Sequence, residues 1–342
     1  MTDRSITRRV ALAASAGLAA TACAHVDNSP NPGPAAATRS RARFGDASGS
    51  YRFKVGEYDC LVVSDGRLRF PAQLYAANAT PAQYEPLLRA NFLPTDVVAN
   101  QTSGLVIDTG RQLLLAETGI TTRWRALTGA PPGSLDDTGT LIPNLRRAGV
   151  ALGDVDAVFV SHGHPDHLGA LLDDRGRLMF PRARIFYDRR DYEYHAGPTS
   201  TQSPEQRAET EVARRILTAL GPNLELTDPG DVIADGVTIF DAAGHTPGHC
   251  GLIIESGGER LMHGADLVAH YVLSLAHPEW SFYATVDKPA EIAARRAFFA
   301  RAADEGQRVF FCHVPFPNLG HVVRDGEGFR WLPEYYAWAD EG

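Results

Sequence analysis

The chain has 342 residues, of which 44% are hydrophobic and 22% are charged. This length suits one large domain or two small ones, and the apolar content is sufficient for a buried core, which excludes a chain that is disordered throughout. The 33 Lys and Arg residues against 41 Asp and Glu residues give a formal net charge of −8, which disfavours electrostatic binding to nucleic acid or to an anionic membrane.

The first 24 residues have the pattern of an export signal. Three arginines within the first nine residues precede an apolar run of small residues, 10–24, which contains Ala-x-Ala cleavage patterns. The segment Thr7–Leu12 (TRRVAL) resembles a twin-arginine signal, the address that bacteria use for folded cargo. We therefore expect residues 1–24 to be a twin-arginine-type signal peptide, with export to the bacterial periplasm or secretion. No other segment has the roughly 20 apolar residues of a transmembrane span.

The segment after the signal is expected to be a tether. Residues 25–50 are rich in Pro, Ala, Ser and Gly without apolar periodicity, which indicates a flexible linker. Cys23 is a candidate lipid-anchor site, although Ala20 stands where such a motif usually has Leu. A folded domain is predicted over residues 51–342. One disulfide is left open among the cysteines of that domain, which are Cys60, Cys250 and Cys312.

From Tyr51 onward, short apolar runs alternate with turn residues. Asp65-Gly66 predicts a hairpin between Cys60–Ser64 and Leu68–Phe70, and Thr109-Gly110 predicts a second turn. The run Ala157–Val160 is apolar without alternation, as in a strand covered on both faces. The later apolar runs predict strands at Val155–Ser161, Ala183–Tyr187, Val237–Asp241, Gly251–Glu255, Arg260–His263 and Arg308–Cys312.

Two helical patterns interrupt these strands. Ser203-Pro204 predicts a capped first turn, followed by an apolar stripe that runs to Leu220. Lys288–Ala303 predicts a second helix with Ile292 and Phe298 among its inward residues. This alternation favours an α/β fold with two sheets covered by helices over a doubly wound nucleotide-binding fold. Neither G-x-G-x-x-G nor a Walker motif occurs.

The segment Ser161–His167 (SHGHPDH) directly follows the predicted buried strand. Its three imidazoles and one carboxylate are costly to bury together unless a cation organises them, and these ligands suit a borderline ion such as zinc. In so tight a loop, His162 and His164 can bind one ion while Asp166 and His167 bind its neighbour. A solvated histidine-rich turn is the plainer alternative.

H-x-H-x-D-H after a strand is the signature of the metallo-β-lactamase fold superfamily, which the chain resembles over most of its length from about Tyr51. The resemblance implies a four-layer αββα sandwich with a dinuclear metal site at the edge of the two sheets. It also implies three later ligands. Gly244–His249 (GHTPGH) is similar to the segment that supplies His245, and the corresponding later positions are Asp266 and His313.

The resemblance divides seven ligands between two divalent ions. The first ion would be held by His162, His164 and His245, the second by Asp166, His167 and His313, and both by Asp266. Zn²⁺ is the expected metal, and Mn²⁺, Fe²⁺ and Co²⁺ remain open because these ligands suit all of them. His249, which follows the ligand segment, is expected to support or pack rather than to bind metal. A structural role is also expected for His263, His270, His277 and His321, and contact of one of them with substrate is left open.

One position departs from the family's pattern. Relatives usually carry Asp-x-Gly at the end of the hairpin strand, where this chain has Glu117-Thr118-Gly119. That aspartate usually supports the metal loop from behind. Because Glu117 is one methylene longer, the sequence leaves the loop geometry open, although not the ligand count.

Within the superfamily, the resemblance is strongest to the exported dinuclear branch that contains methyl parathion hydrolase and acyl-homoserine-lactone lactonases. It implies two ions about 3.5–4 Å apart and a bridging hydroxide that attacks a carbonyl or phosphorus centre. Asp166 and Asp266 are the expected catalytic carboxylates, and Asp266 would also help carry a proton to the leaving group. The segments that support this branch are Asp156–Gly169, His277–Trp280, Asp287–Glu305 and His313–Pro317.

The expected substrate is a small neutral or lipophilic lactone, aryl ester or phosphotriester, because the chain is acidic. Two alternatives stay open: a β-lactam hydrolase on the same fold, and a mononuclear iron sulfur oxygenase or non-catalytic metal-binding module. No partner beyond the small-molecule substrate is predicted, and the oligomeric state cannot be read. Aromatic residues that could line the pocket, most of them expected in the core, are Phe180, Phe186, Tyr187, Tyr192, Tyr194, Tyr271 and Trp280.

Overall fold

A computed structural model describes residues 49–335 except 126 and 129. The predicted signal peptide, the candidate lipid anchor at Cys23 and all but the end of the predicted linker lie outside these residues. Within them, no helix is both long and apolar enough to cross a membrane. Cys60, Cys250 and Cys312 are buried free thiols, so no disulfide joins them.

The first sheet has seven strands in the order β1-β2-β3-β4-β5-β6-β7. Neighbours from β1 to β4 are antiparallel, and neighbours from β4 to β7 are parallel. Ala157 and Phe159 of β5 pack into the space between the sheets while Val158 and Val160 pack beneath helices, as the unbroken apolar run predicts. The strands are β1 (Ser50–Val55), β2 (Tyr58–Pro71), β3 (Val97–Asp108), β4 (Leu113–Ala116), β5 (Ala157–Val160), β6 (Arg184–Asp188) and β7 (Leu224–Thr227).

The second sheet has seven strands in the order β14-β13-β12-β11-β10-β9-β8, of which only β11 and β12 run parallel. Its inner face packs on the first sheet through a shared core that includes Leu105 from one side and Ile239 and Leu252 from the other. The strands are β8 (Val232–Ala234), β9 (Val237–Asp241), β10 (Cys250–Ser256), β11 (Glu259–His263), β12 (Arg308–Phe310), β13 (Leu319–Asp325) and β14 (Gly328–Pro333).

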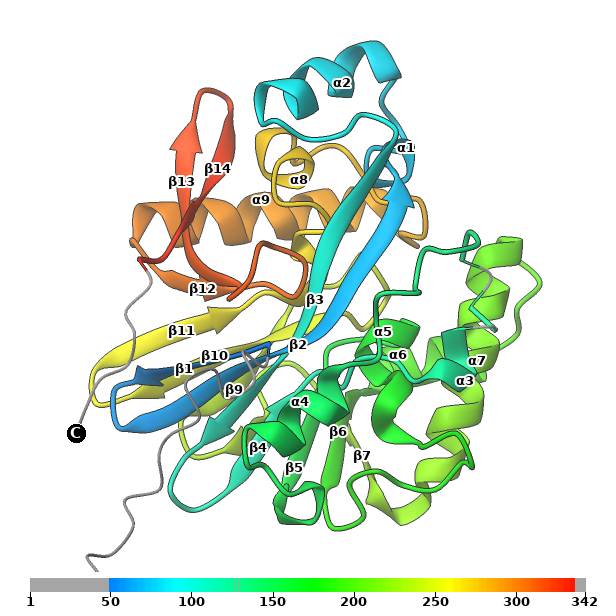
Figure 1. The fold of residues 1–342 in the computed structure, drawn as a ribbon, viewed down its shortest axis with the longest axis vertical. Coiled ribbons are helices and arrows are strands. Elements are labelled where there is room, and N and C mark those ends of the chain that lie inside the picture. The colour runs from blue at the N-terminus through cyan, green and yellow to red at the C-terminus, as the bar shows by residue number, and fades with distance from the viewer. Residues whose placement is uncertain (1–48, 126, 129, 336–342) are drawn as a thin grey trace, which may run out of the picture. The chain divides into compact units, whose positions relative to one another are not determined.

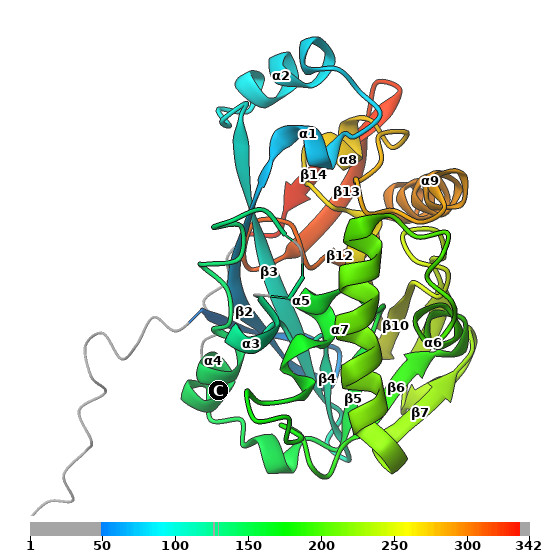
Figure 2. The same ribbon diagram turned by 90° about the vertical axis from the view of Figure 1, so that its right-hand side faces the viewer.

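Helices cover the outer face of each sheet, which completes the predicted αββα sandwich (Figures 1 and 2). The helix α7 lies on the first sheet and α9 on the second. The long β2–β3 pair extends beyond its sheet and carries α1 and α2 (Figure 1). The helices are α1 (Ala72–Tyr75), α2 (Pro81–Ala90), α3 (Thr122–Arg125), α4 (Leu141–Arg147), α5 (Pro165–Leu168), α6 (Arg189–Ala196), α7 (Pro204–Leu220), α8 (Leu273–Ala276) and α9 (Lys288–Asp304), with 3₁₀ turns η1 (Leu152–Asp154), η2 (Gly169–Leu171), η3 (Gly221–Asn223) and η4 (Ala265–Leu267).

The predicted hairpin at Asp65-Gly66 is wrong. The chain runs straight through this point as one strand, β2, with an irregularity between Ser64 and Gly66. The Asp65 side chain does not stabilise a turn, because it accepts hydrogen bonds from the backbone N–H groups of Ile120 and Leu141 at 3.1 and 2.9 Å. The predicted turn at Thr109-Gly110 is confirmed between β3 and β4.

The two predicted helices are confirmed as α7 and α9. Ser203 caps α7 by accepting from the backbone N–H of Gln206. On α9, Phe298 is buried as predicted, but Ile292 is only partly buried. A charged pair, Glu291 and Arg295, occupies the inner face instead. Glu291 faces inward because its carboxylate contacts the predicted ligand His245.

Candidate metal centre

The predicted ligands come from four loops that meet at one edge of the sandwich. His162, His164, Asp166 and His167 follow β5, and His245 lies in the loop between β9 and β10. Asp266 lies in η4 after β11, and His313 follows β12. All seven side chains lie in this one region, where their nitrogen and oxygen atoms form two adjoining clusters.

The first cluster consists of three imidazoles and one carboxylate. Nε2 of His162 lies 2.9 Å from Nδ1 of His164, which lies 3.0 Å from Nε2 of His245. Oδ2 of Asp266 lies 3.3 Å from the same His245 nitrogen. Three ring nitrogens and one carboxylate oxygen therefore point at a common centre, which is the arrangement of a metal site.

The second cluster adjoins the first through Asp266. Oδ2 of Asp166 lies 3.5 Å from Nε2 of His167 and 3.4 Å from Nε2 of His313. Oδ1 of Asp266 lies 3.1 Å from the His167 nitrogen and 3.3 Å from that of His313. The two oxygens of Asp266 thus face different clusters, as a bridging carboxylate requires.

The chemistry of these residues fits bound cations. Oδ1 of Asp266 and Nε2 of His167 are buried, and although they lie 3.1 Å apart, neither has a hydrogen bond of suitable geometry in the described part of the chain. Burial would raise the pKa of Asp266, but the imidazoles of His313 and His167 hold it well below its usual value. Burial lowers the pKa of His162 well below the usual histidine value, so this ring is neutral, the form that binds metal. Two clusters of buried acceptors suggest two metal ions.

Glu117, the departure from the family's pattern, supports the centre. It follows β4, and its Oε2 lies 3.0 Å from Nδ1 of His167. Its Oε1 lies 3.6 Å from Nε2 of the buried His263. The contact orients the His167 ring and leaves Nε2 toward the second cluster. The longer side chain of Glu117 thus reaches the metal loop and contacts His167.

A buried ion pair of α9 supports the first cluster. Oε1 of Glu291 lies 3.3 Å from Nδ1 of His245 and 2.8 Å from the guanidinium of Arg295. Arg295 also donates to the backbone carbonyls of Leu267, Pro278 and Trp280. These contacts explain why charged residues occupy the inner face of α9. Sequence analysis missed both, although their i, i+4 spacing on the inner face was a usable signal.

Asp191 on α6 holds two metal loops together. The wholly buried carboxylate accepts from the backbone N–H of Gly163 at 2.7 Å and of Gly248 at 3.1 Å. It also accepts from the hydroxyl of Tyr187 at 2.6 Å, and Nε2 of His195 lies 3.5 Å away. Gly163 lies between the predicted ligands His162 and His164, and Gly248 lies in the separate motif that contains His245. Sequence analysis missed Asp191 because no local pattern marks it.

Two of the other histidines have partners near the site. Nε2 of His249 accepts from the backbone N–H of Asp266 at 3.1 Å, and its Nδ1 lies 2.8 Å from the carbonyl oxygen of Ala242. His277 stacks on Trp280 with ring centroids 3.8 Å apart. Neither histidine belongs to a cluster that could hold a metal within the described residues.

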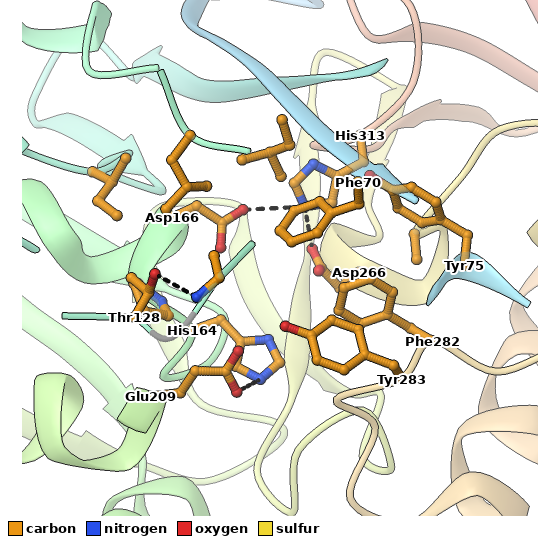
Figure 3. Close-up of a pocket in the computed structure, with 16 residues that line it drawn as sticks. Phe70, Tyr75, Thr128, His164, Asp166, Glu209, Asp266, Phe282, Tyr283 and His313 are labelled. Atoms are coloured by element: carbon orange, nitrogen blue, oxygen red, sulfur yellow. Dashed lines mark hydrogen bonds and ion pairs between the residues drawn. The ribbon is translucent and has the colours of Figure 1, made fainter. Parts of the chain in front are cut away.

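A pocket opens over both clusters (Figure 3). Its walls are mainly apolar and aromatic, and no Lys or Arg occurs among the described residues that line it. None of the seven aromatic residues named from the sequence lines it; Phe180, Phe186 and Tyr187 are buried in the core instead. The lining residues are Leu68, Phe70, Tyr75, Ile120, Thr128, Ala130, Leu135, His164, Pro165, Asp166, Glu209, Asp266, Ala269, Phe282, Tyr283 and His313.

Comparison with known proteins agrees with this geometry. Residues 97–313 match the family model described as the metallo-beta-lactamase superfamily. The dizinc quorum-quenching lactonase AidC, solved with the product N-hexanoyl-L-homoserine, is 28% identical with a TM-score of 0.78, over 85% of this chain and 99% of AidC. No curated protein sequence gives a significant match.

Two further solved structures share the fold at lower identity. The hydrolase AbOPH of the beta lactamase superfamily is 22% identical with a TM-score of 0.75, over 85% of this chain and 99% of its own. A probable metal-dependent hydrolase from Staphylococcus aureus is 17% identical with a TM-score of 0.66, over 83% and 100% of the two chains.

Proposed function

Because the chain belongs to the metallo-β-lactamase superfamily and is a metallohydrolase, we propose that it is an exported dinuclear enzyme that opens small neutral lactones and related esters. The observation that carries the proposal is the bridging position of Asp266 between two clusters beneath an apolar pocket. The likeness to AidC, named a dizinc lactonase, supports lactones as the first substrate class. The N-terminal sequence supports export.

Seven residues are proposed to hold the ions, most simply Zn²⁺, with the division given by the two clusters. His162, His164 and His245 would hold one ion, Asp166, His167 and His313 would hold the other, and Asp266 would contact both. When bound, such ions provide Lewis acidity and lower the pKa of water. No side-chain nucleophile is required.

The protein's own residues position the substrate and move the proton. Asp166 and Asp266 line the pocket floor, where either carboxylate can accept a proton from the attacking water, and Asp266 can return one to the leaving oxygen. The aromatic walls of Phe70, Phe282 and Tyr283 exclude water and receive an acyl or alkyl chain. The proposed role of these walls is affinity for lipophilic substrates.

The charge of the pocket disfavours the β-lactam alternative. A β-lactam antibiotic carries a carboxylate, which an enzyme commonly pairs with Lys or Arg. No such side chain occurs among the described residues of the pocket wall, whereas Asp166, Glu209 and Asp266 are acidic. These carboxylates would repel the carboxylate of a β-lactam, whereas a neutral lactone or phosphotriester carries no charge for them to repel.

The experiment is a substrate panel run on protein of measured metal content. The panel contains an N-acyl-homoserine lactone, a simple γ-lactone, an aryl ester, a neutral phosphotriester and a chromogenic β-lactam. We expect chelator-sensitive turnover of the lactones and none of the β-lactam. Two bound ions without turnover of any lactone or ester would overturn the proposal, and a single bound iron would favour the oxygenase alternative.

A further inference from the structure

Arg295 on α9 is a buried cation that joins separate segments of the site. Its guanidinium lies 2.8 Å from Oε1 of Glu291, and both side chains are wholly buried. The same guanidinium donates to the carbonyl oxygens of Leu267 at 2.8 Å, Pro278 at 3.0 Å and Trp280 at 2.7 Å. Because burying a charged group is costly, the guanidinium stays inside only while these partners surround it.

Two of these contacts lead to predicted metal ligands. Oε1 of Glu291, the oxygen beside Arg295, also lies 3.3 Å from Nδ1 of His245, whose Nε2 faces the first cluster. Leu267 directly follows Asp266, the carboxylate that faces both clusters. The guanidinium therefore contacts the support of one ligand and the backbone next to another. An ion that fixed both ligands would also fix the groups that hold Arg295.

The other two contacts lead to the wall of the pocket. Pro278 and Trp280 belong to the segment 277–283, which follows α8 and contains neither helix nor strand. The segment ends in Phe282 and Tyr283, which line the pocket (Figure 3). Because no regular secondary structure fixes this segment, its conformation depends on side-chain contacts such as those of the guanidinium.

We propose that Arg295 is a positioning residue that couples the first cluster to the pocket. When an ion fills the cluster, the guanidinium holds the segment 277–283 in the conformation that receives substrate. This inference rests on the proposed function, because it concerns the substrate pocket of the same site. Among the described residues, Arg295 belongs neither to the lining of the pocket nor to a cluster that could hold a metal. Coupling of this kind is reciprocal, so a molecule seated against the wall also tightens the ion.

The test is residue-resolved hydrogen exchange of backbone amides, measured in metal-free protein and after addition of Zn²⁺. In the wild type we expect Zn²⁺ to slow exchange in 277–283 by about tenfold to a hundredfold, the equivalent of one hydrogen bond to a charged group. Arg295→Lys keeps a cation beside Glu291, but one ammonium group cannot replace the planar fork that reaches three carbonyl groups. In this variant Zn²⁺ should leave exchange in 277–283 unchanged.

Two controls separate the coupling from a general loss of structure. The backbone N–H of Val286 donates directly to the carbonyl oxygen of His245 at 3.0 Å. Its exchange should still slow with Zn²⁺ in Arg295→Lys, because this connection bypasses the guanidinium. Arg301→Lys changes an exposed arginine of the same helix and should behave as the wild type.

Steady-state kinetics of the metal-loaded protein give a second readout. With N-hexanoyl-homoserine lactone as substrate, Arg295→Lys should raise KM by about tenfold and leave kcat near the wild-type value, because the metal ligands remain and only the wall is loosened. A role in stability alone would reduce the fraction of folded protein, and hence the apparent kcat, without raising KM. Metal content is measured for each variant, so that a loss of ions is recognised. A lower kcat with unchanged KM would contradict the positioning role.

The exchange measurement needs no turnover, so it decides the inference whether or not the proposed function is correct. Equal slowing of 277–283 by Zn²⁺ in the wild type and in Arg295→Lys would overturn it, as would the absence of slowing in the wild type. If Arg295→Lys does not fold, Glu291→Gln tests the other end of the link, since it weakens the contact between His245 and Arg295. The effect of Zn²⁺ on 277–283 should then fall below the wild-type effect, and an undiminished effect would overturn the inference.

Discussion

Glu117 Oε2 lies 3.0 Å from Nδ1 of His167, so the residue that departs from the family's pattern is the one that orients a predicted ligand. Hydrogen bonds of this kind fix the tautomer of a metal-binding imidazole and raise its basicity. The contact is buried, because both side chains are almost wholly inaccessible.

Shortening Glu117 should therefore weaken metal binding. In Glu117→Asp the carboxylate retreats by one methylene and loses contact with His167, so we expect about 10- to 100-fold weaker binding of the second ion. Competition with a chromophoric chelator measures this. Glu57→Asp, an exposed residue before β2, is the control. Unchanged affinity for both ions in Glu117→Asp would contradict the assigned role.

Asp191 should act on both metal loops at once. Asp191→Asn keeps the shape of the side chain but replaces the charged carboxylate, which accepts from the backbone N–H groups of Gly163 and Gly248, with a neutral amide. We expect a loss of about 1–3 kcal/mol in the free energy of unfolding, together with weaker binding of the first ion. Denaturant unfolding and metal titration measure the two effects. The exposed Glu193→Gln on the same helix should show neither, and a stable Asp191→Asn with full metal affinity speaks against the prediction.

Gly163 has no room for a side chain. A Cβ at this position would lie 2.1 Å from Nε2 of His195 and 2.6 Å from the hydroxyl of Tyr187. Gly163→Ala should thus displace the first metal loop and destabilise the protein by about 1–3 kcal/mol. Gly153→Ala is the matched control, because nothing lies within 4 Å of a Cβ there. Equal unfolding free energies for the two variants would show that the loop absorbs the methyl group.

The buried pair of α9 should be essential to stability. Arg295→Met leaves the Glu291 carboxylate buried without its cation and frees three backbone carbonyls. We expect a loss of about 3–5 kcal/mol in the free energy of unfolding. Arg296→Met changes an exposed neighbour that pairs with Glu279 and should cost far less. If chemical denaturation showed only a small loss in the free energy of unfolding for Arg295→Met, the prediction would be wrong, and water would have replaced the guanidinium.

The metal motifs could be predicted from the sequence because their residues are close together in the chain. Four of the seven predicted ligands lie within His162–His167, and this loop also identified the fold. Asp191 and Glu209 could not be predicted in this way, whereas the i, i+4 spacing of Glu291 and Arg295 was a signal that sequence analysis missed. Each lies on a helix and finds its partner only after the sheets and helices have packed.

The errors have the same origin. Asp65-Gly66 has the composition of a turn, but β2 continues because β3 offers pairing on both sides of the irregularity. The pocket wall comes from Phe70 and Tyr75 on the long β2–β3 extension and from Phe282 after α8, not from the aromatic residues around β6. Such surfaces depend on long-range packing, which local composition does not encode.

The most direct test of the account is the metal stoichiometry of the purified protein, measured by elemental analysis with His313→Ala beside it. Two ions per chain in the wild type, and one in the variant with the first cluster intact, is the predicted result, since His313 belongs only to the second cluster. One ion per chain in both proteins would contradict a dinuclear centre bridged by Asp266.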